Sequence, residues 1–422
     1  QLEGRAWALR TYYGGQAPAA APDKSIVRDL PGTAAWHTIE EATEAIGNSM
    51  GFAPLEPLQT PWAIFDAQGG RLKDMEALRA APVAFFLEVG VWMWPAVRVG
   101  FEQQLRDVGG GTALLRTLSL RPKVFEVREF LSAEETEEVM RLGEAQGLHA
   151  SEGVMQSRDV EAGTKHNQFR TSKQAWLGNS LSPLIATLDL RVSDLTRVPA
   201  SHNEQVQLLR YGEGQYYHAH MDWTELELYD NQKDLWISSH FGFQDRLATV
   251  FWYLNDVEEG GETFFPKHGQ PICEPASRGG EPTRLCPGAF DPDMKSCDGG
   301  LKVPPRKGSV ILWYNFHASG RGDRNSLHAG CPVGSNLTKW SANKWVRIKP
   351  LHSTARWIAG HPAVKRHSWV EGSAEVDPNA CQMEFLNEAG VQVDVMWKAD
   401  QGEAHGHDLH KIESVLVDGR SS

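Results

Sequence analysis

The chain has 422 residues, of which 41% are hydrophobic, and this is enough for more than one folded unit with a sizeable core. Its 42 lysine and arginine residues are outnumbered by 54 aspartate and glutamate residues, which gives a formal net charge of −12. Binding to nucleic acid requires a concentrated positive surface, so this charge balance argues against a nucleic-acid partner.

The first part of the chain, residues 1–122, carries no functional signal. Residues 1–30 are rich in alanine, glycine and proline and predict an extended arm, and residues 37–47 predict a helix. The apolar stretch 81–101 is interrupted by charged residues and by Pro95, so it predicts a pair of buried strands and no stable membrane span. We assign this part to an N-terminal arm and accessory region.

A helix is predicted at residues 133–146. Ser132 and Glu135 form a capping box, in which the serine hydroxyl and the glutamate carboxylate accept hydrogen bonds from free amides at the start of the helix. Gly147 is expected to end this helix.

Beyond Glu204, short runs of apolar, β-branched and aromatic residues alternate with turn residues, which predicts a sandwich or barrel of antiparallel strands. The predicted strands are residues 206–211, 247–254, 261–265, 309–314 and 344–348. After residue 350 the composition becomes polar, and a strand-like unit at residues 382–397 predicts a small C-terminal β-rich module, residues 351–422.

Three of the five cysteines, Cys273, Cys286 and Cys297, lie in one insert rich in glycine and proline. A disulfide within this insert would fit a protein of the secretory pathway, and free thiols are the alternative. No signal peptide is visible, and we interpret the start at Gln1 as the result of removal of a leader or of trimming.

The strongest chemical signal is a set of two histidines and one aspartate. His220 and Asp222 lie two residues apart just after a strand-like run, so in extended backbone their side chains point the same way. This pair alone is weak evidence, but His328 follows the apolar strand 309–314. Two histidines and a carboxylate on a β-scaffold are the facial triad of non-haem Fe(II) oxygenases.

Such an iron needs an electron donor to activate O₂, and 2-oxoglutarate is a common one. Its distal carboxylate requires a cation, which Lys339 can supply from a position shortly after His328. Outside this context, a solvated surface lysine would be the better interpretation.

Several segments resemble the prolyl 4-hydroxylase catalytic domain over about residues 124–350. They are FLSAEETEEV, Arg170-Thr171-Ser172, EQVQLLRY (204–211), RYGEGQYYHAHMD (210–222), RLATVFWYLNDVEEGGETFFP (246–266), and SLHAGCPV followed by TKWSANKW (326–345). The resemblance implies an α+β fold with a mainly β core, a double-stranded β-helix (a cupin-like jelly roll) flanked by helices, as a domain at residues 123–350.

The resemblance also implies roles for individual residues. His220, Asp222 and His328 match the iron ligands, and Lys339 matches the lysine that binds the distal carboxylate of 2-oxoglutarate, with Tyr211 and Thr263 as companions. The residues matching peptide-groove positions and aromatic positions near the proline are Arg170, Ser172, Glu204, Tyr217, Arg246 and Trp345.

The chain departs from the family pattern at three places. Residues 223–243 form a long segment that we interpret as a lid over the peptide groove. Arg347 stands where many relatives have a histidine, and an extra residue between His328 and Lys339 must be absorbed at residues 334–338.

What the resemblance implies is an Fe(II)- and 2-oxoglutarate-dependent dioxygenase that uses O₂, with ascorbate as a further cofactor. Peptidyl proline in a proline-rich peptide or protein would become 4-hydroxyproline, with release of succinate and CO₂, in the lumen of the endoplasmic reticulum. A partner subunit is not identified by the sequence. Two alternatives stay open, namely the same oxygenase chemistry on another residue or small molecule, and a non-catalytic binding or scaffold subunit.

Overall fold

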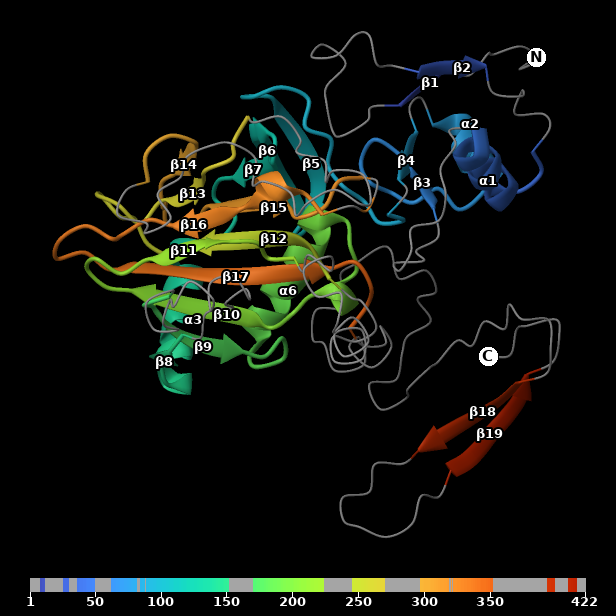
Figure 1. The fold of residues 1–422 in the computed structure, drawn as a ribbon. Helices are drawn as coiled ribbons and strands as arrows, with labels where there is room; N and C mark the ends of the chain where they lie inside the picture. The colour runs from blue at the N-terminus through green and yellow to red at the C-terminus, as the bar shows by residue number, and fades with distance from the viewer. Residues whose placement is uncertain are drawn as a thin grey trace, which may run out of the picture. The chain divides into compact units, whose positions relative to one another are not determined.

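The computed structural model of the chain is shown in Figure 1. The residues that it describes are 8–11, 26–29, 36–49, 62–81, 84–87, 89–151, 170–223, 245–269, 297–318, 320, 322–351, 393–398 and 409–415. The chain divides into two compact units, Gln1–Thr354 and Ala355–Ser422, and each is described by itself.

A nine-stranded antiparallel sheet forms the larger layer of the first unit, with the strand order β5-β6-β7-β15-β12-β17-β10-β9-β8. In chain order its strands are β5 (Glu102–Val108), β6 (Gly111–Leu120), β7 (Lys123–Val127), β8 (His149–Ala150), β9 (Lys173–Leu177), β10 (Val206–Tyr211), β12 (Arg246–Tyr253), β15 (Val310–Tyr314) and β17 (Lys339–Arg347).

A four-stranded antiparallel sheet has the order β11-β16-β13-β14. Its strands are β11 (Tyr217–His220), β13 (Thr263–Phe265), β14 (Leu301–Val303) and β16 (His328–Gly330).

The pairing of strands β10 to β17 is that of a jelly roll. The first of these strands pairs with the last (β10 with β17), and the nested pairs β11·β16, β12·β15 and β13·β14 follow inward. Successive nested pairs of this rolled hairpin fall alternately into the large and the small sheet. The fold expected from the resemblance, a β-rich jelly roll flanked by helices, is confirmed.

Alternation along the strands places two different cores on the two faces of the large sheet. On β15, Leu312 and Tyr314 pack into one core, whereas Ile311 and Trp313 pack into the other, together with Tyr217 of the small sheet. Successive side chains of a strand point to opposite faces, so this pattern follows from the sequence period of two. The second core is therefore the interior of the jelly roll.

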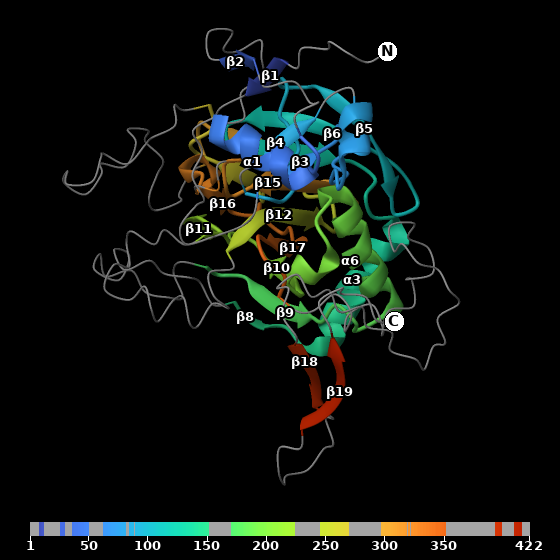
Figure 2. The ribbon, with the colours of Figure 1, turned by 90° about the vertical axis from the view of Figure 1, so that its right-hand side faces the viewer.

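Two long helices cover the outer face of the large sheet, as Figure 2 shows for α3 (Ala133–Gln146) and α6 (Pro183–Thr196). The capping box of Ser132 and Glu135 predicted for α3 is present. Arg191 of α6 joins the two helices, because its guanidinium lies 2.7 Å from Glu135. Gly143 permits the close approach of α3 to the sheet, since a Cβ there would meet the Leu208 side chain at 1.8 Å.

The described part of the chain before β5 contains short elements. These are β1 (Ala8–Thr11), β2 (Ile26–Asp29), α1 (Ile39–Ser49), β3 (Ala63–Phe65), α2 (Met75–Ala80) and β4 (Phe85–Leu87). The helix predicted at residues 37–47 is confirmed by α1, and no helix in the described part of the chain is long and apolar enough to cross a membrane. Strands β1 and β2 pair with each other in the region predicted as an extended arm.

The prediction of two strands in the apolar stretch 81–101 is wrong for the second strand. From Val89 to Phe101 the chain has no helix or strand, although Trp92 and Trp94 are buried. The backbone amide of Trp94 donates to the Tyr314 hydroxyl at 2.9 Å, and its indole donates to the Leu195 carbonyl at 2.7 Å. Tertiary hydrogen bonds thus take the place of a strand ladder.

A disulfide joins Cys297 to Cys331, with their Cα atoms 6.0 Å apart. The prediction of a bridge within the insert is therefore corrected for Cys297, whose partner lies in the segment just after β16. The residues following Cys297 lead into β14, which belongs to the same small sheet as β16, and this brings the two cysteines together. Cys273 and Cys286 lie outside the described residues.

In the second unit, β18 (Val393–Lys398) pairs with β19 (Leu409–Val415) in an antiparallel hairpin.

Candidate active site

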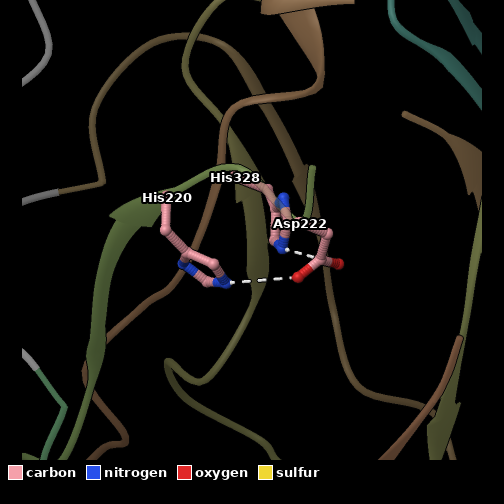
Figure 3. Close-up of side chains that lie close together, drawn as sticks. All are labelled: His220, Asp222 and His328. Carbon is pink, nitrogen blue, oxygen red and sulfur yellow. Dashed lines mark ion pairs between the residues drawn. The ribbon is translucent and has the colours of Figure 1, made fainter. Parts of the chain in front are cut away.

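The two histidines of the predicted triad stand opposite each other on neighbouring strands of the small sheet. His220 is the last residue of β11, His328 is the first of β16, and they are direct partners in the strand register. Asp222 follows β11 immediately, so all three side chains meet at one end of the β11·β16 pair (Figure 3). Their ligand atoms lie within 4.8 Å of one another, which allows the group to hold a metal ion.

The histidine rings present the nitrogen that a metal requires. The Nδ1 of His220 lies 2.8 Å from the His218 carbonyl, and the Nδ1 of His328 lies 2.9 Å from the Ser326 carbonyl. A carbonyl only accepts, so each Nδ1 carries a proton, and Nε2 is the ring nitrogen that faces the other members of the triad and can bind a metal. Burial, together with the neighbouring His328, lowers the pKa of His220 to about 3, which keeps its ring neutral.

The Asp222 carboxylate supplies the negative charge of the group. Its oxygens lie 3.8 Å from the Nε2 of His220 and 3.6 Å from the Nε2 of His328. Burial acts to raise the pKa of Asp222, but His328, His220, Arg246 and a hydrogen bond from Thr249 outweigh it and hold the pKa at about 2. Two imidazoles and one carboxylate match the donor set of a non-haem Fe(II) site, so the residues fit this metal.

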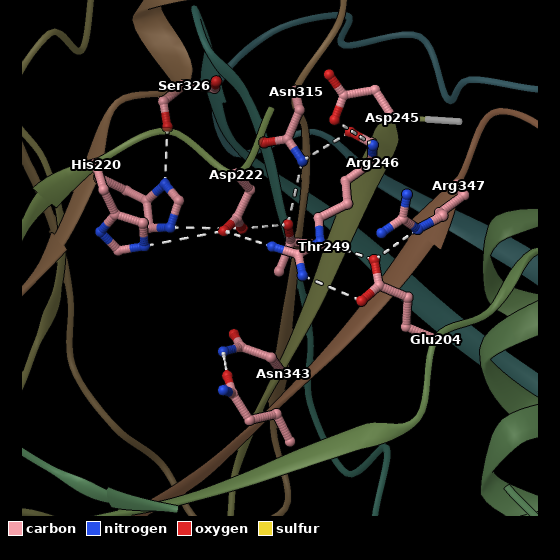
Figure 4. A network of polar contacts seen from close by, with 12 residues as sticks. Glu204, His220, Asp222, Asp245, Arg246, Thr249, Asn315, Ser326, Asn343 and Arg347 are labelled. Carbon is pink, nitrogen blue, oxygen red and sulfur yellow. Dashed lines mark hydrogen bonds and ion pairs between the residues drawn. The ribbon is translucent and has the colours of Figure 1, made fainter. Parts of the chain in front are cut away.

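A charged cluster extends from Asp222 toward the start of β12 and the end of β17, two central strands of the large sheet (Figure 4). Arg246 lies 3.9 Å from an Asp222 oxygen and forms two hydrogen bonds with Glu204, at 2.7 and 3.0 Å. Arg347 also contacts Glu204, at 2.8 Å, and the Arg246 guanidinium lies 3.5 Å from the centre of the Trp345 ring. The structure thus brings the predicted residues Glu204, Arg246 and Trp345 together.

On the other side of the histidines, the Tyr217 ring stacks on His220 with a centroid distance of 3.7 Å. Arg170 lies over the Tyr217 ring at 4.4 Å and donates from Nε to the Ser172 hydroxyl at 3.2 Å. Arg170, Ser172 and Tyr217, predicted as groove residues, therefore form a second cluster next to the triad.

Lys339 lies in the interior of the jelly roll, with only 2% of its surface exposed. It pairs with Tyr211 in the β10·β17 register, and its ammonium lies 5.4, 5.2 and 5.8 Å from the rings of Tyr211, Phe251 and Tyr253. Burial lowers the pKa of Lys339 to about 7, and Glu262 acts in the opposite direction. No carboxylate among the described residues forms an ion pair with Lys339. A buried cation in such surroundings favours an anionic ligand, because that partner offsets the cost of burial.

Thr263 is linked to the surroundings of Lys339 by Tyr253, a residue that was not predicted from the sequence. The Tyr253 hydroxyl donates to Thr263 at 2.7 Å, and the Tyr253 ring faces Lys339. The missed residues Thr249 and Tyr253 lie on one face of β12 together with Phe251, so the period of two along this strand was the signal for them.

Two further departures from the family pattern are the extra residue before Lys339 and the predicted lid. The expected irregularity at residues 334–338 is present as a turn in which Asn336 has a φ of 61°. Of the predicted lid, only Trp223 is described: its indole donates to the Asp323 carbonyl at 3.3 Å, and residues 224–243 lie outside the described residues.

Comparison with known proteins agrees with this geometry. Residues 206–347 match the family model of the 2OG-Fe(II) oxygenase superfamily. Probable prolyl 4-hydroxylase 6 of Arabidopsis thaliana is 33% identical over 233 residues, which cover 55% of this chain and 71% of the relative. Human prolyl 4-hydroxylase subunit alpha-1 is 30% identical over 226 residues, but these cover 54% of this chain and only 34% of the human protein.

Among solved structures, a viral collagen prolyl hydroxylase from Paramecium bursaria Chlorella virus-1, in complex with 2OG, is similar with a TM-score of 0.35 and 23% identity. The match covers 53% of this chain and 95% of the viral protein.

Proposed function

This chain belongs to the prolyl 4-hydroxylase family of 2-oxoglutarate-dependent dioxygenases, and on that premise we propose that it hydroxylates peptidyl proline to 4-hydroxyproline. The observation that carries this proposal is the convergence of His220, Asp222 and His328 within 4.8 Å. Bound Fe(II), with 2-oxoglutarate and O₂, would supply the oxidation, in which the keto acid becomes succinate and CO₂ and the proline gains one hydroxyl.

In this proposal the chain's own residues bind and orient the reactants. His220, Asp222 and His328 hold the metal, and Lys339 binds the distal carboxylate of 2-oxoglutarate from within the jelly roll, beside Tyr211 and Thr263. The buried aromatic rings around Lys339 exclude water, which strengthens the attraction between the ammonium and the carboxylate.

The peptide is proposed to lie across the two clusters that flank the triad. Tyr217 and Trp345 offer aromatic surfaces, and prolines in an extended polyproline II chain pack well on such surfaces. The remaining members of these clusters are Arg170, Ser172, Glu204 and Arg246. Their hydrogen-bonding groups would contact the peptide backbone.

The proposal extends to the cellular compartment of the protein and to the reductant of its iron. The Cys297–Cys331 disulfide supports an oxidising compartment, and we assign the protein to the secretory pathway, in the lumen of the endoplasmic reticulum. Ascorbate is proposed as the reductant that keeps the iron in its ferrous state.

Succinate formation tests the proposed substrate. We expect release of succinate to be stimulated by a proline-rich peptide and not by the same peptide with alanine in place of proline. The proline peptide should gain the mass of one oxygen atom. Stimulation by free amino acids or other side chains alone would overturn the proposed substrate and leave the oxygenase chemistry standing.

Binding of 2-oxoglutarate is expected to weaken as the pH rises through about 7, the value to which burial lowers the pKa of Lys339. Only the protonated amine attracts the distal carboxylate, because Glu262, whose charge also acts on Lys339, is negative. The apparent dissociation constant should rise roughly tenfold between pH 6 and pH 8.

Calorimetric titration of the Mn(II)-loaded protein with 2-oxoglutarate, in buffers of different ionisation enthalpy, measures this effect. Proton uptake on binding should approach one at pH 8 and nearly vanish at pH 6. An affinity that is constant over this range, without proton uptake, would contradict the assignment of Lys339.

A further inference from the structure

A line of buried polar side chains leads away from Asp222 and has no place in the proposed binding of substrate or cosubstrate. Its members are Thr249 on β12, Trp313 on β15 and Asn315 just after β15 (Figure 4 shows Thr249 and Asn315). Thr249 and Asn315 are 0% exposed, and Trp313 is 1% exposed. Polar groups so deeply buried are retained only at a cost, unless each is hydrogen-bonded.

The line is connected by three hydrogen bonds. The Thr249 hydroxyl lies 2.7 Å from the Oδ2 of Asp222, the Asn315 Nδ2 lies 3.2 Å from the Thr249 hydroxyl, and the Trp313 Nε1 lies 3.1 Å from the Oδ1 of Asn315. The β12·β15 register explains the connection, because Thr249 and Trp313 are direct partners across these two strands.

The chemistry of the donors gives the line a single direction. An indole nitrogen only donates, so the amide atom of Asn315 that faces Trp313 is its oxygen, and its NH₂ group faces Thr249. An amide NH₂ also only donates, so the Thr249 oxygen accepts from it. The one hydroxyl hydrogen of Thr249 is thereby left for the Asp222 carboxylate.

The effect on Asp222 is to fix its orientation. Rotation of a carboxylate about its terminal bond is otherwise broad, and a charge-assisted hydrogen bond in a buried place restricts it. The same indole of Trp313 packs against the ring of His328, with a centroid distance of 4.6 Å. Trp313 therefore contacts His328 directly. It also orients Asp222, through Asn315 and Thr249.

We propose that Thr249 is a positioning residue for the metal site, held in its donating orientation by Asn315 and Trp313. This inference rests on the proposed metal-binding role of Asp222. A hydrogen bond to a carboxylate that binds a metal fixes the orientation of that carboxylate. Loss of such a bond commonly reduces metal affinity.

Titration of the full chain with Co(II), followed by its visible absorption, tests the proposal without measuring turnover. Thr249→Val keeps the shape of the side chain and removes the hydroxyl, and it should raise the Co(II) dissociation constant roughly 10- to 100-fold. Thr249→Ser restores the donor and should bind Co(II) within about threefold of the wild type. The melting temperatures of the metal-free proteins establish that each variant is folded.

A cycle with Trp313→Phe separates positioning from packing. This variant keeps a ring next to His328 and loses the indole donor, so it should weaken Co(II) binding less than Thr249→Val does. If Trp313 acts through Thr249, the double variant should bind no more weakly than Thr249→Val alone, because coupled residues are not additive. The proposal can still be tested if Thr249→Val is poorly folded, because Trp313→Phe alone should weaken Co(II) binding.

Two results would overturn the proposal in distinguishable ways. Folded Thr249→Val that binds Co(II) as tightly as the wild type, or additive losses in the cycle, would remove the positioning role and leave the proposed function intact. A wild-type chain that binds no Co(II) would overturn the metal site itself, and the positioning role with it.

Discussion

Replacement of Asp222 by asparagine is expected to lower proline-dependent succinate formation by roughly 100-fold or more. Asp222 is the one anion of the triad, and an amide in its place offers neither the charge nor the same affinity for a divalent metal. The Thr249 hydroxyl, oriented to donate to a carboxylate at 2.7 Å, would also meet a weaker acceptor. Rates measured at saturating 2-oxoglutarate and peptide, over a range of Fe(II) concentrations, provide the test.

The matched control for this prediction is Asp298→Asn, which changes an exposed carboxylate in the segment before β14. It should retain the wild-type rate within about twofold, as expected for a surface substitution. Asp222→Asn protein that is folded, and that turns over as fast as this control, would show that the metal does not lie at the triad.

Replacement of Lys339 by methionine should abolish tight binding of 2-oxoglutarate. Loss of one partner of a buried ion pair costs about 3–5 kcal/mol, which corresponds to an increase of more than about 100-fold in the dissociation constant. Lys339→Arg keeps the charge but places a larger, planar head among the surrounding rings, so we expect an intermediate affinity. Calorimetric titration of the Mn(II)-loaded proteins measures these differences.

Stability provides the internal control for Lys339→Met. Because burial lowers the pKa of Lys339 below its ordinary value, keeping this amine charged at neutral pH destabilises the fold. Methionine removes that cost, so the variant without 2-oxoglutarate should melt at least as high as the wild type. A variant with normal melting and unchanged affinity for 2-oxoglutarate would remove Lys339 from the site.

Five strands of the jelly roll, β10, β12, β13, β15 and β17, and the triad were accessible from the sequence, because both rest on local patterns. Short runs rich in apolar, β-branched and aromatic residues located residues 206–211 and 309–314, which form β10 and β15. His220 and Asp222 could be paired from their spacing of two in extended backbone. The position of His328 after an apolar strand, together with the resemblance, completed the set.

Contacts between distant strands were not accessible in the same way. The line from Trp313 to Asp222 depends on the register that sets Thr249 opposite Trp313, and no local pattern reports a register. The partner of Cys297 depends likewise on the order of strands in the small sheet. The irregular course around Trp94 is held by hydrogen bonds to Leu195 and Tyr314, so the apolar composition alone misled the strand prediction.

The nested pairing of β11 with β16 links metal binding to folding. Each of these strands brings one histidine, and the strands come from opposite halves of the rolled hairpin, so an unfolded chain has no preformed site. A divalent ion that binds only the folded jelly roll raises its free energy of unfolding. At ion concentrations well above the dissociation constant, this increase grows with the logarithm of the ratio of the two. Iron supply would then set the free energy of unfolding of this protein as well as its catalytic capacity.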